Sequence, residues 1–218
     1  MEKINTYIDH TLLKPDATTA DIIKLCEEAR AYQFYAVCIN SSHIALAREE
    51  LTDSDVKIAA VVGFPLGACS TETKVYETDY SCTYGADEID MVLHIGALKE
   101  KRYDYVKNDI AAVVSVAQKY NAVVKVILET NFLTKEEIVR ACELALEAGA
   151  DFVKTSTGFS GGGATVEDVK LMKDTVGSAM KVKASGGIKS YDTAVSMIEA
   201  GADRLGASAS VDIVNLYK

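Results

Sequence analysis

Three lysines recur at an equal interval in the second half of the chain. Lys125, Lys154 and Lys183 lie 29 positions apart, and each stands within a short apolar run that has the character of a strand. Amines that share a protein interior repel one another, and burial disfavours their charge, so both effects lower a lysine pKa from its ordinary value of about 10.4. An amine that is partly neutral near pH 7 can attack an aldehyde and form a Schiff base.

Acidic residues and a thiol occupy comparable places on other predicted strands. Asp9 and Cys38 lie on the first and second strands, and Asp90 lies on the fourth. Buried charges must pair or neutralise, so carboxylates and amines that meet in one interior form a network. An aspartate in such a network can relay protons. The alternative is an ion network with a structural role only, because such networks also perturb pKa values.

Small residues follow the last three predicted strands. The segments contain Gly158 and glycines 161–163, then Gly186 and Gly187, then Gly206 and Ser208. Backbone N–H groups of glycine-rich loops and helix N-termini can surround a phosphate. The alternative is that these glycines only form tight turns. Three such loops in succession favour an anion site.

The elements that must position these residues alternate along the chain. Apolar runs predict strands at 7–10, 36–39, 58–62, 88–93, 123–128, 182–184 and 204–207, with a further short strand that contains Lys154. Helical periodicity predicts helices at 20–32, 41–51, 71–84, 103–120, 135–149 and 191–200, and others that begin near 165 and 210. Thr18, Thr134 and Thr165 are expected to cap helices, the second in a capping box with Glu137.

Eight β/α units predict an α/β protein with a TIM (β/α)8 barrel, formed as a single domain by residues 1–218. A Gly-Ala-Asp repeat that begins at Gly85, Gly149 and Gly201 precedes three of the strands, and its glycines are expected to end helices in the left-handed conformation. An open doubly wound sheet is the alternative, but no GxGxxG follows the first strand. In a TIM barrel the site lies at the C-terminal ends of the strands.

Charge, cysteine content and histidine content limit the partners, the compartment and the kinds of site that we expect. The net charge of −9 argues against a nucleic-acid or anionic-membrane partner. Five cysteines without a CxxC pair indicate reduced thiols, and the start lacks a signal-peptide pattern, so we expect a cytoplasmic protein. Three histidines without a paired ligand spacing predict no metal site.

Several segments, in order through almost the whole chain, resemble the deoxyribose-phosphate aldolase family. They are DHTLL at 9–13, AVC at 36–38, EID at 88–90, VKVILET at 124–130, DFVKTSTG at 151–158 and KASGG at 183–187. The resemblance implies a class I aldolase without metal or cofactor. Such an enzyme, a lyase of deoxyribonucleotide catabolism, cleaves 2-deoxy-D-ribose 5-phosphate reversibly to D-glyceraldehyde 3-phosphate and acetaldehyde.

By matching position, the resemblance makes Lys154 the Schiff-base lysine, Lys183 the neighbour that tunes it and shuttles protons, and Asp90 the proton donor and acceptor. Asp9 would support the lysines and Cys38 would line the pocket. The remaining residues expected to bind or support the substrate are Thr11, Lys125, Thr157, Gly158, Gly186, Gly187, Gly206 and Ser208. The resemblance also implies a phosphorylated sugar as the partner, and a homodimer or homotetramer.

Three other functions remain open from the residues alone. An isomerase or synthase on the same barrel would use acid–base chemistry and leave Lys154 without a covalent adduct. A non-catalytic phospho-sugar binder would show no turnover. A metal-dependent aldolase would lose its activity to a chelator.

Overall fold

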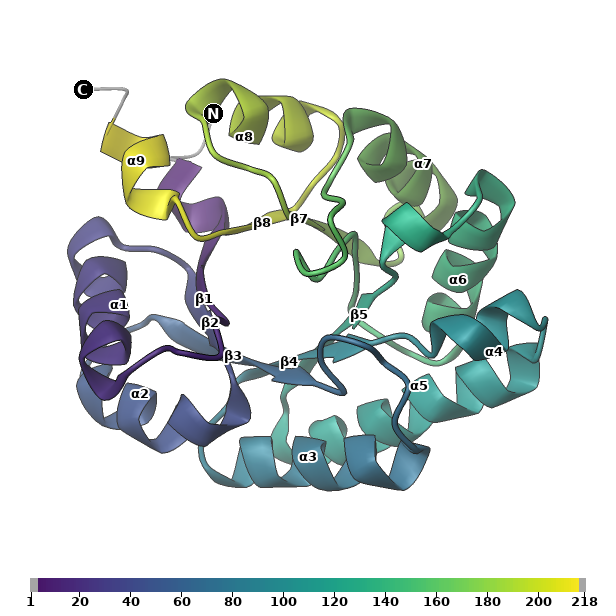
Figure 1. The fold of residues 1–218 in the computed structure, drawn as a ribbon, viewed down its shortest axis with the longest axis horizontal. Coiled ribbons are helices and arrows are strands. Elements are labelled where there is room, and N and C mark those ends of the chain that lie inside the picture. The colour runs from purple at the N-terminus through teal and green to yellow at the C-terminus, as the bar shows by residue number, and fades with distance from the viewer. Residues whose placement is uncertain (1–3, 216–218) are drawn as a thin grey trace.

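Eight parallel strands form a closed barrel that helices surround (Figure 1). The computed structural model describes residues 4–215. The strands are β1 (Ile8–Leu12), β2 (Ala36–Ile39), β3 (Lys57–Val62), β4 (Glu88–Val92), β5 (Val123–Ile127), β6 (Phe152–Lys154), β7 (Lys181–Ser185) and β8 (Arg204–Ala207). Each strand pairs with the next and β8 pairs with β1, so the sheet has no free edge. The predicted TIM barrel is confirmed.

Nine α-helices lie in the described part of the chain. They are α1 (Thr19–Tyr32), α2 (Ile44–Glu50), α3 (Thr71–Thr83), α4 (Ile95–Lys99), α5 (Tyr103–Ala117), α6 (Lys135–Glu147), α7 (Val166–Val176), α8 (Tyr191–Glu199) and α9 (Ser210–Asn215). Among residues 4–215, no helix has both the length and the apolar character needed to cross a bilayer.

The predicted boundaries differ from the structure in a few places. Residues 4–7 form a 3-10 turn, so the first strand is Ile8–Leu12 rather than 7–10. The segment Ser41–His43 is a 3-10 turn before α2, and Gln118–Tyr120 is another after α5. The short helix α4 was not predicted, because five residues are too few to show a helical period.

Side-chain hydrogen bonds fix the starts of several helices. The Thr18 side chain accepts from the backbone N–H of Asp21, and Thr134 forms the predicted capping box with Glu137. Thr165 caps α7 in the same way. Positive φ angles mark the three glycines of the predicted repeat, Gly85, Gly149 and Gly201. These local signals set where each strand follows its helix.

Strand side chains alternate between two environments. Residues such as Ile8, Val37 and Leu205 face outwards and join the large apolar core between the barrel and the helices. Inside the barrel, a small apolar cluster contains Cys38, Ala59 and Val61 from β2 and β3, together with Leu13. The other strands place charged residues inside, and these form the site.

Candidate active site

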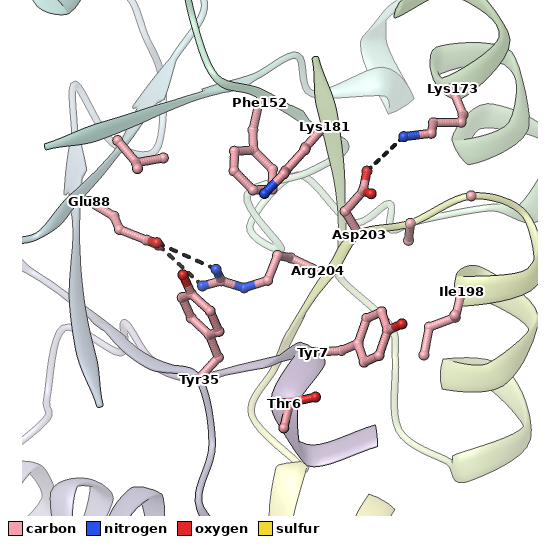
Figure 2. Close-up of a pocket in the computed structure, with 13 residues that line it drawn as sticks. Thr6, Tyr7, Tyr35, Glu88, Phe152, Lys173, Lys181, Ile198, Asp203 and Arg204 are labelled. Atoms are coloured by element: carbon pink, nitrogen blue, oxygen red, sulfur yellow. Dashed lines mark hydrogen bonds and ion pairs between the residues drawn. The ribbon is translucent and has the colours of Figure 1, made fainter. Parts of the chain in front are cut away.

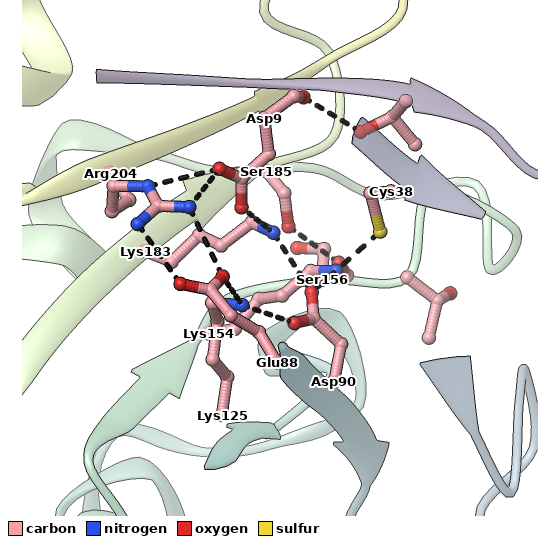
Figure 3. A network of polar contacts seen from close by, with 12 residues as sticks. Asp9, Cys38, Glu88, Asp90, Lys125, Lys154, Ser156, Lys183, Ser185 and Arg204 are labelled. Carbon is pink, nitrogen blue, oxygen red and sulfur yellow. Dashed lines mark hydrogen bonds and ion pairs between the residues drawn. The ribbon is translucent and has the colours of Figure 1, made fainter. Parts of the chain in front are cut away.

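Seven charged side chains fill the barrel interior, and we call them the interior network (Figure 3). They are Asp9, Glu88, Asp90, Lys125, Lys154, Lys183 and Arg204, and none is more than 4% exposed. They come from β1, β4, β5, β6, β7 and β8. Inward-facing positions recur every second residue along a strand, which is why Glu88 and Asp90 both point inside.

Asp90 lies at the centre of the interior network. Its Oδ2 accepts from Lys154 Nζ at 2.7 Å and from Lys183 Nζ at 2.8 Å. Its Oδ1 accepts from Lys125 Nζ at 2.7 Å. Lys154 and Lys183 are also register partners on β6 and β7. The structure therefore brings together the lysines and the aspartate that the sequence selected, with two amines on one carboxylate oxygen.

A second set of ion pairs lies deeper in the barrel than Asp90, towards the N-terminal ends of the strands. Asp9 pairs with Lys183 and with the guanidinium of Arg204. The same guanidinium lies 3.2 Å from Glu88, which in turn accepts from Lys125 at 2.5 Å. Sequence reasoning did not assign Glu88 or Arg204 to the site. For Glu88 the available signal was its place two residues before Asp90, on the same face of the strand.

The network shifts the pKa values of its carboxyl groups. Burial alone would raise the pKa of Asp90, but the charges of Lys125, Lys154 and Lys183 outweigh it and hold that pKa well below the ordinary value. Burial also opposes ionisation of Asp9, yet Lys183 and Arg204 lower its pKa to about 2. Both aspartates are therefore anions near pH 7.

The pKa values of two lysines move in the opposite direction. Burial would lower the pKa of Lys183, but Asp9 and Asp90 raise it above the ordinary lysine value. Asp90 and Glu88 likewise overcome burial and raise the pKa of Lys125. Lys183 is thus a cation near pH 7, and it lies beside the Lys154 amine.

A pocket of about 340 Å³ opens above the network at the C-terminal ends of the strands. Lys154 lines it together with seven of the predicted binding residues, namely Thr11, Thr157, Gly158, Gly186, Gly187, Gly206 and Ser208. Lys14 and Lys189 also line it, although neither was predicted. Cys38 was predicted to line the pocket, but it is not among the residues that line this one. Its Sγ lies deeper, 3.9 Å from Asp90 Oδ2, because the residue points into the closed part of the barrel.

Comparison with known proteins identifies the family of the chain. A model described as DeoC/LacD family aldolase matches residues 3–214. The chain belongs to this aldolase family. It is 62% identical over 214 residues to the deoxyribose-phosphate aldolase of Thermococcus kodakarensis, covering 97% of this chain and 96% of that one. It is 60% identical over 211 residues to the deoxyribose-phosphate aldolase of Clostridium novyi, covering 97% and 95%.

A solved structure shows the same fold. The structure described as a unique tetrameric deoxyribose phosphate aldolase from Aeropyrum pernix is 34% identical and has a TM-score of 0.93. The match covers 98% of this chain and 90% of that one. The protein is therefore an enzyme of the lyase class, as the sequence predicted.

Two glycines of this aldolase allow close approaches that a side chain would block. A Cβ on Gly163 would lie 2.5 Å from the carbonyl oxygen of Gly186, so the loops after β6 and β7 pack directly together. A Cβ on Gly206 would lie 2.9 Å from Cβ of Ser185 and 3.2 Å from Cε of Lys183. Gly206 thus makes room for both side chains as well as lining the pocket, a role that sequence reasoning did not find.

A further polar contact at the mouth of the aldolase joins the loops after β5 and β6. Glu129 is only 2% exposed, and it accepts hydrogen bonds from the backbone N–H and the hydroxyl of Thr157. Sequence reasoning used Glu129 only as part of a family segment and gave it no role. The structure places it directly behind a pocket residue.

A second cavity, of about 510 Å³, opens at the opposite end of the barrel (Figure 2). Arg204 faces this cavity, with the ring of Tyr35 3.4 Å from its guanidinium carbon. The carboxylate of Glu88 pairs with the same guanidinium, as Figure 2 shows. The Arg204–Glu88 pair and Tyr35 thus separate this cavity from the buried lysines, and Lys154 lines the pocket at the C-terminal mouth instead.

Proposed function

We propose that the chain is a class I aldolase that cleaves 2-deoxy-D-ribose 5-phosphate reversibly to D-glyceraldehyde 3-phosphate and acetaldehyde. The names of its relatives support this substrate. The observation that carries the proposal is the placement of two amines, Lys154 and Lys183, on one oxygen of Asp90. In this proposal Lys154 forms the Schiff base, Lys183 tunes it, and Asp90 moves protons.

The charge balance of the interior network supports a neutral amine. The network has four basic groups and three carboxyl groups, and its aspartates stay ionised. Full protonation of the basic groups would leave one uncompensated positive charge in a buried site, which is costly. Among these basic groups, only Lys154 lines the pocket at the mouth, and within residues 4–215 it forms an ion pair with Asp90 alone. It is therefore the amine that a substrate in the pocket can reach.

The neutral amine would begin the reaction. Lys154 Nζ attacks C1 of the open-chain aldehyde, and loss of water gives a protonated imine. Removal of the C3 hydroxyl proton lets the C2–C3 bond break, so that C3 becomes the aldehyde carbon of glyceraldehyde 3-phosphate. The electron pair of that bond forms the C1–C2 double bond of an enamine, and the imine nitrogen accepts the displaced pair.

The second half of the reaction returns the enzyme to its starting state. The enamine takes a proton at C2 through Asp90, Lys183 and a water molecule, which regenerates the imine. Water then adds to C1, acetaldehyde leaves, and Lys154 is free again. The water lost in imine formation balances the water used in its hydrolysis.

The loops around the mouth would hold the phosphate. Gly186, Gly187 and Ser208 lie in the loops after β7 and β8, the usual phosphate site of this fold. Lys14 and Lys189 line the same pocket and supply positive charge. Binding energy from this remote group can position the reacting carbons.

The other residues at the site would support these groups. Asp9 and Lys125 hold the network together, and Cys38 packs beside Asp90. Thr11, Thr157, Gly158 and Gly206 would contact the sugar from the pocket wall.

Several broader properties belong to the same proposal. Residues 1–218 would act as one aldolase domain, without metal or cofactor, in the cytoplasm and in deoxyribonucleotide catabolism. We also propose a homodimer or homotetramer, in line with the tetrameric relative from Aeropyrum pernix.

Borohydride reduction tests the proposal. The enzyme is incubated with 2-deoxy-D-ribose 5-phosphate, reduced, and analysed by peptide mass spectrometry. We expect a reduced adduct on Lys154, and no adduct at this position and no turnover in Lys154→Ala. Turnover without an adduct would support an isomerase, and binding without turnover would support a phospho-sugar binder. Loss of activity with a chelator would support a metal-dependent aldolase.

A further inference from the structure

Glu129 adopts a backbone conformation that is unusual for its residue type. Its φ of 56° and ψ of 62° lie in the left-handed region, directly after β5. Non-glycine residues in this region carry strain of about 1 kcal/mol or more, so surrounding contacts must hold them there. With this backbone conformation the chain turns from the barrel wall to the mouth, and the Glu129 carboxylate is buried.

The carboxylate has one principal partner. Its oxygens lie 3.2 and 3.3 Å from the backbone nitrogen of Thr157, whose hydroxyl donates a short hydrogen bond to Oε2. Within residues 4–215, no lysine, arginine or histidine nitrogen forms an ion pair with Glu129. The hydrogen bonds from Thr157 are therefore the polar contacts that offset the burial of this carboxylate. Glu129 differs in this respect from Asp90, which three ammonium groups surround.

The Thr157 hydroxyl stands between Glu129 and the pocket. Thr157 lines the pocket together with Lys154, and its Oγ1 also accepts from the backbone N–H of Phe159 at 3.1 Å. A hydroxyl has one proton to donate, and here that proton points to Glu129. The oxygen can therefore offer only a lone pair to a ligand, which suits it to accept a hydrogen bond from a sugar hydroxyl.

We propose that Thr157 and Glu129 form the relay that removes the C3 hydroxyl proton during bond cleavage, an inference that rests on the proposed aldolase function. The C3 hydroxyl proton passes to Thr157 Oγ1 while the Thr157 proton passes to the Glu129 carboxylate. The electron pair left on the C3 oxygen forms the C3–O double bond, and the C2–C3 pair forms the enamine. Glu129 ends as a neutral acid and returns its proton through Thr157 to water after the aldehyde leaves.

The alternative base for this proton is Asp90. Its two oxygens already accept from Lys125, Lys154 and Lys183, and these charges hold its pKa well below the ordinary value. These hydrogen bonds occupy lone pairs that the carboxylate would otherwise offer to a substrate hydroxyl. Asp90 is better suited to moving protons between Lys183 and the enamine, so the two carboxylates would serve different steps.

The test separates C3 chemistry from enamine chemistry. Acetaldehyde exchanges its methyl protons in D2O through the Lys154 enamine, and this exchange involves no C3 hydroxyl. We expect Glu129→Gln and Thr157→Val to lower kcat for sugar cleavage by about 100-fold, a typical contribution of acid–base catalysis. Their exchange rates are expected to stay within about twofold of the parent enzyme, and Thr157→Ser is expected to recover most of the cleavage.

A matched control uses the same substitution at a neighbouring buried hydroxyl. Thr130 is 4% exposed and its Oγ1 has no hydrogen-bond partner, so Thr130→Val should leave both rates unchanged. Equal losses of cleavage and exchange in the Thr157 and Glu129 variants would reduce their role to structural support. Undiminished cleavage in Thr157→Val would overturn the relay outright. Absence of exchange in the parent enzyme would instead count against the Lys154 enamine itself.

Discussion

Replacement of Lys183 by methionine tests the charge balance of the interior network. Methionine keeps an unbranched chain of similar length but removes the cation next to the Lys154 amine. The network then has three basic groups and three carboxyl groups, so full protonation leaves no surplus charge. The surplus positive charge that the proposed function uses is then absent, so we expect Lys154 to be a poorer nucleophile in this variant.

The size of the effect follows from the usual contribution of an acid–base group to an enzyme rate, about 100- to 10,000-fold. We therefore expect kcat/KM of Lys183→Met at pH 7.5 to fall by about 100- to 1,000-fold.

The assay is kcat/KM for cleavage at pH 7.5, coupled to detection of glyceraldehyde 3-phosphate. Lys181→Met is the matched control, because Lys181 lies on the same strand but is exposed. The Lys181→Met enzyme should match the parent in activity. Removing one member of a buried ion pair costs about 3–5 kcal/mol, so folding is checked by circular dichroism at the assay temperature. A folded Lys183→Met enzyme with near-parent activity would refute the reasoning.

Three further predictions concern the scaffold. The pKa of Asp9 is lowered to about 2 in the folded state, so its ionised form stabilises the fold above about pH 4. This stabilisation is lost as pH falls from about 4 to about 2. Urea titrations should show that the free energy of unfolding drops by about 2 kcal/mol because of this group. Gly206→Ala should displace Ser185 and Lys183 and lower kcat more than it raises KM, measured by steady-state kinetics. An unchanged kcat would contradict this. Asp109→Asn should destabilise the fold by about 3–5 kcal/mol in urea titrations, because it leaves the fully buried Lys74 without its carboxylate; an unchanged unfolding midpoint would contradict this.

The order of elements was predictable because its signals are local. Thr134 and Glu137 mark the start of α6 by their types and spacing, and Gly149 marks the turn after it. The exact bounds of β1 were not predictable, because the pairing of its strand with β2 and β8 decides them. Barrel closure itself followed from the count of β/α units rather than from any single residue.

The centre of the site was predictable because charge is unexpected on a strand. Asp90 and the lysines stood out for that reason, and strand periodicity put them inside. Arg204 stood out less, because it begins its strand directly after Asp203, where a charged residue is common. Glu129 could not have been found from its residue type. Its role depends on a left-handed backbone and on a contact with Thr157, and both arise only in three dimensions.

The interior network and the residues at the mouth lie in different parts of the chain. The network residues lie on strands whose register is fixed by the closed barrel, whereas residues such as Thr157 and Ser208 lie in loops. Phe64 and Phe159, from the loops after β3 and β6, contact each other with ring centroids 5.2 Å apart, and Phe159 lines the pocket. Under the proposed function, acceptor selectivity could therefore be redesigned in these loops without changes to the strands that hold Lys154, and directed evolution toward new aldehydes should accumulate changes there first.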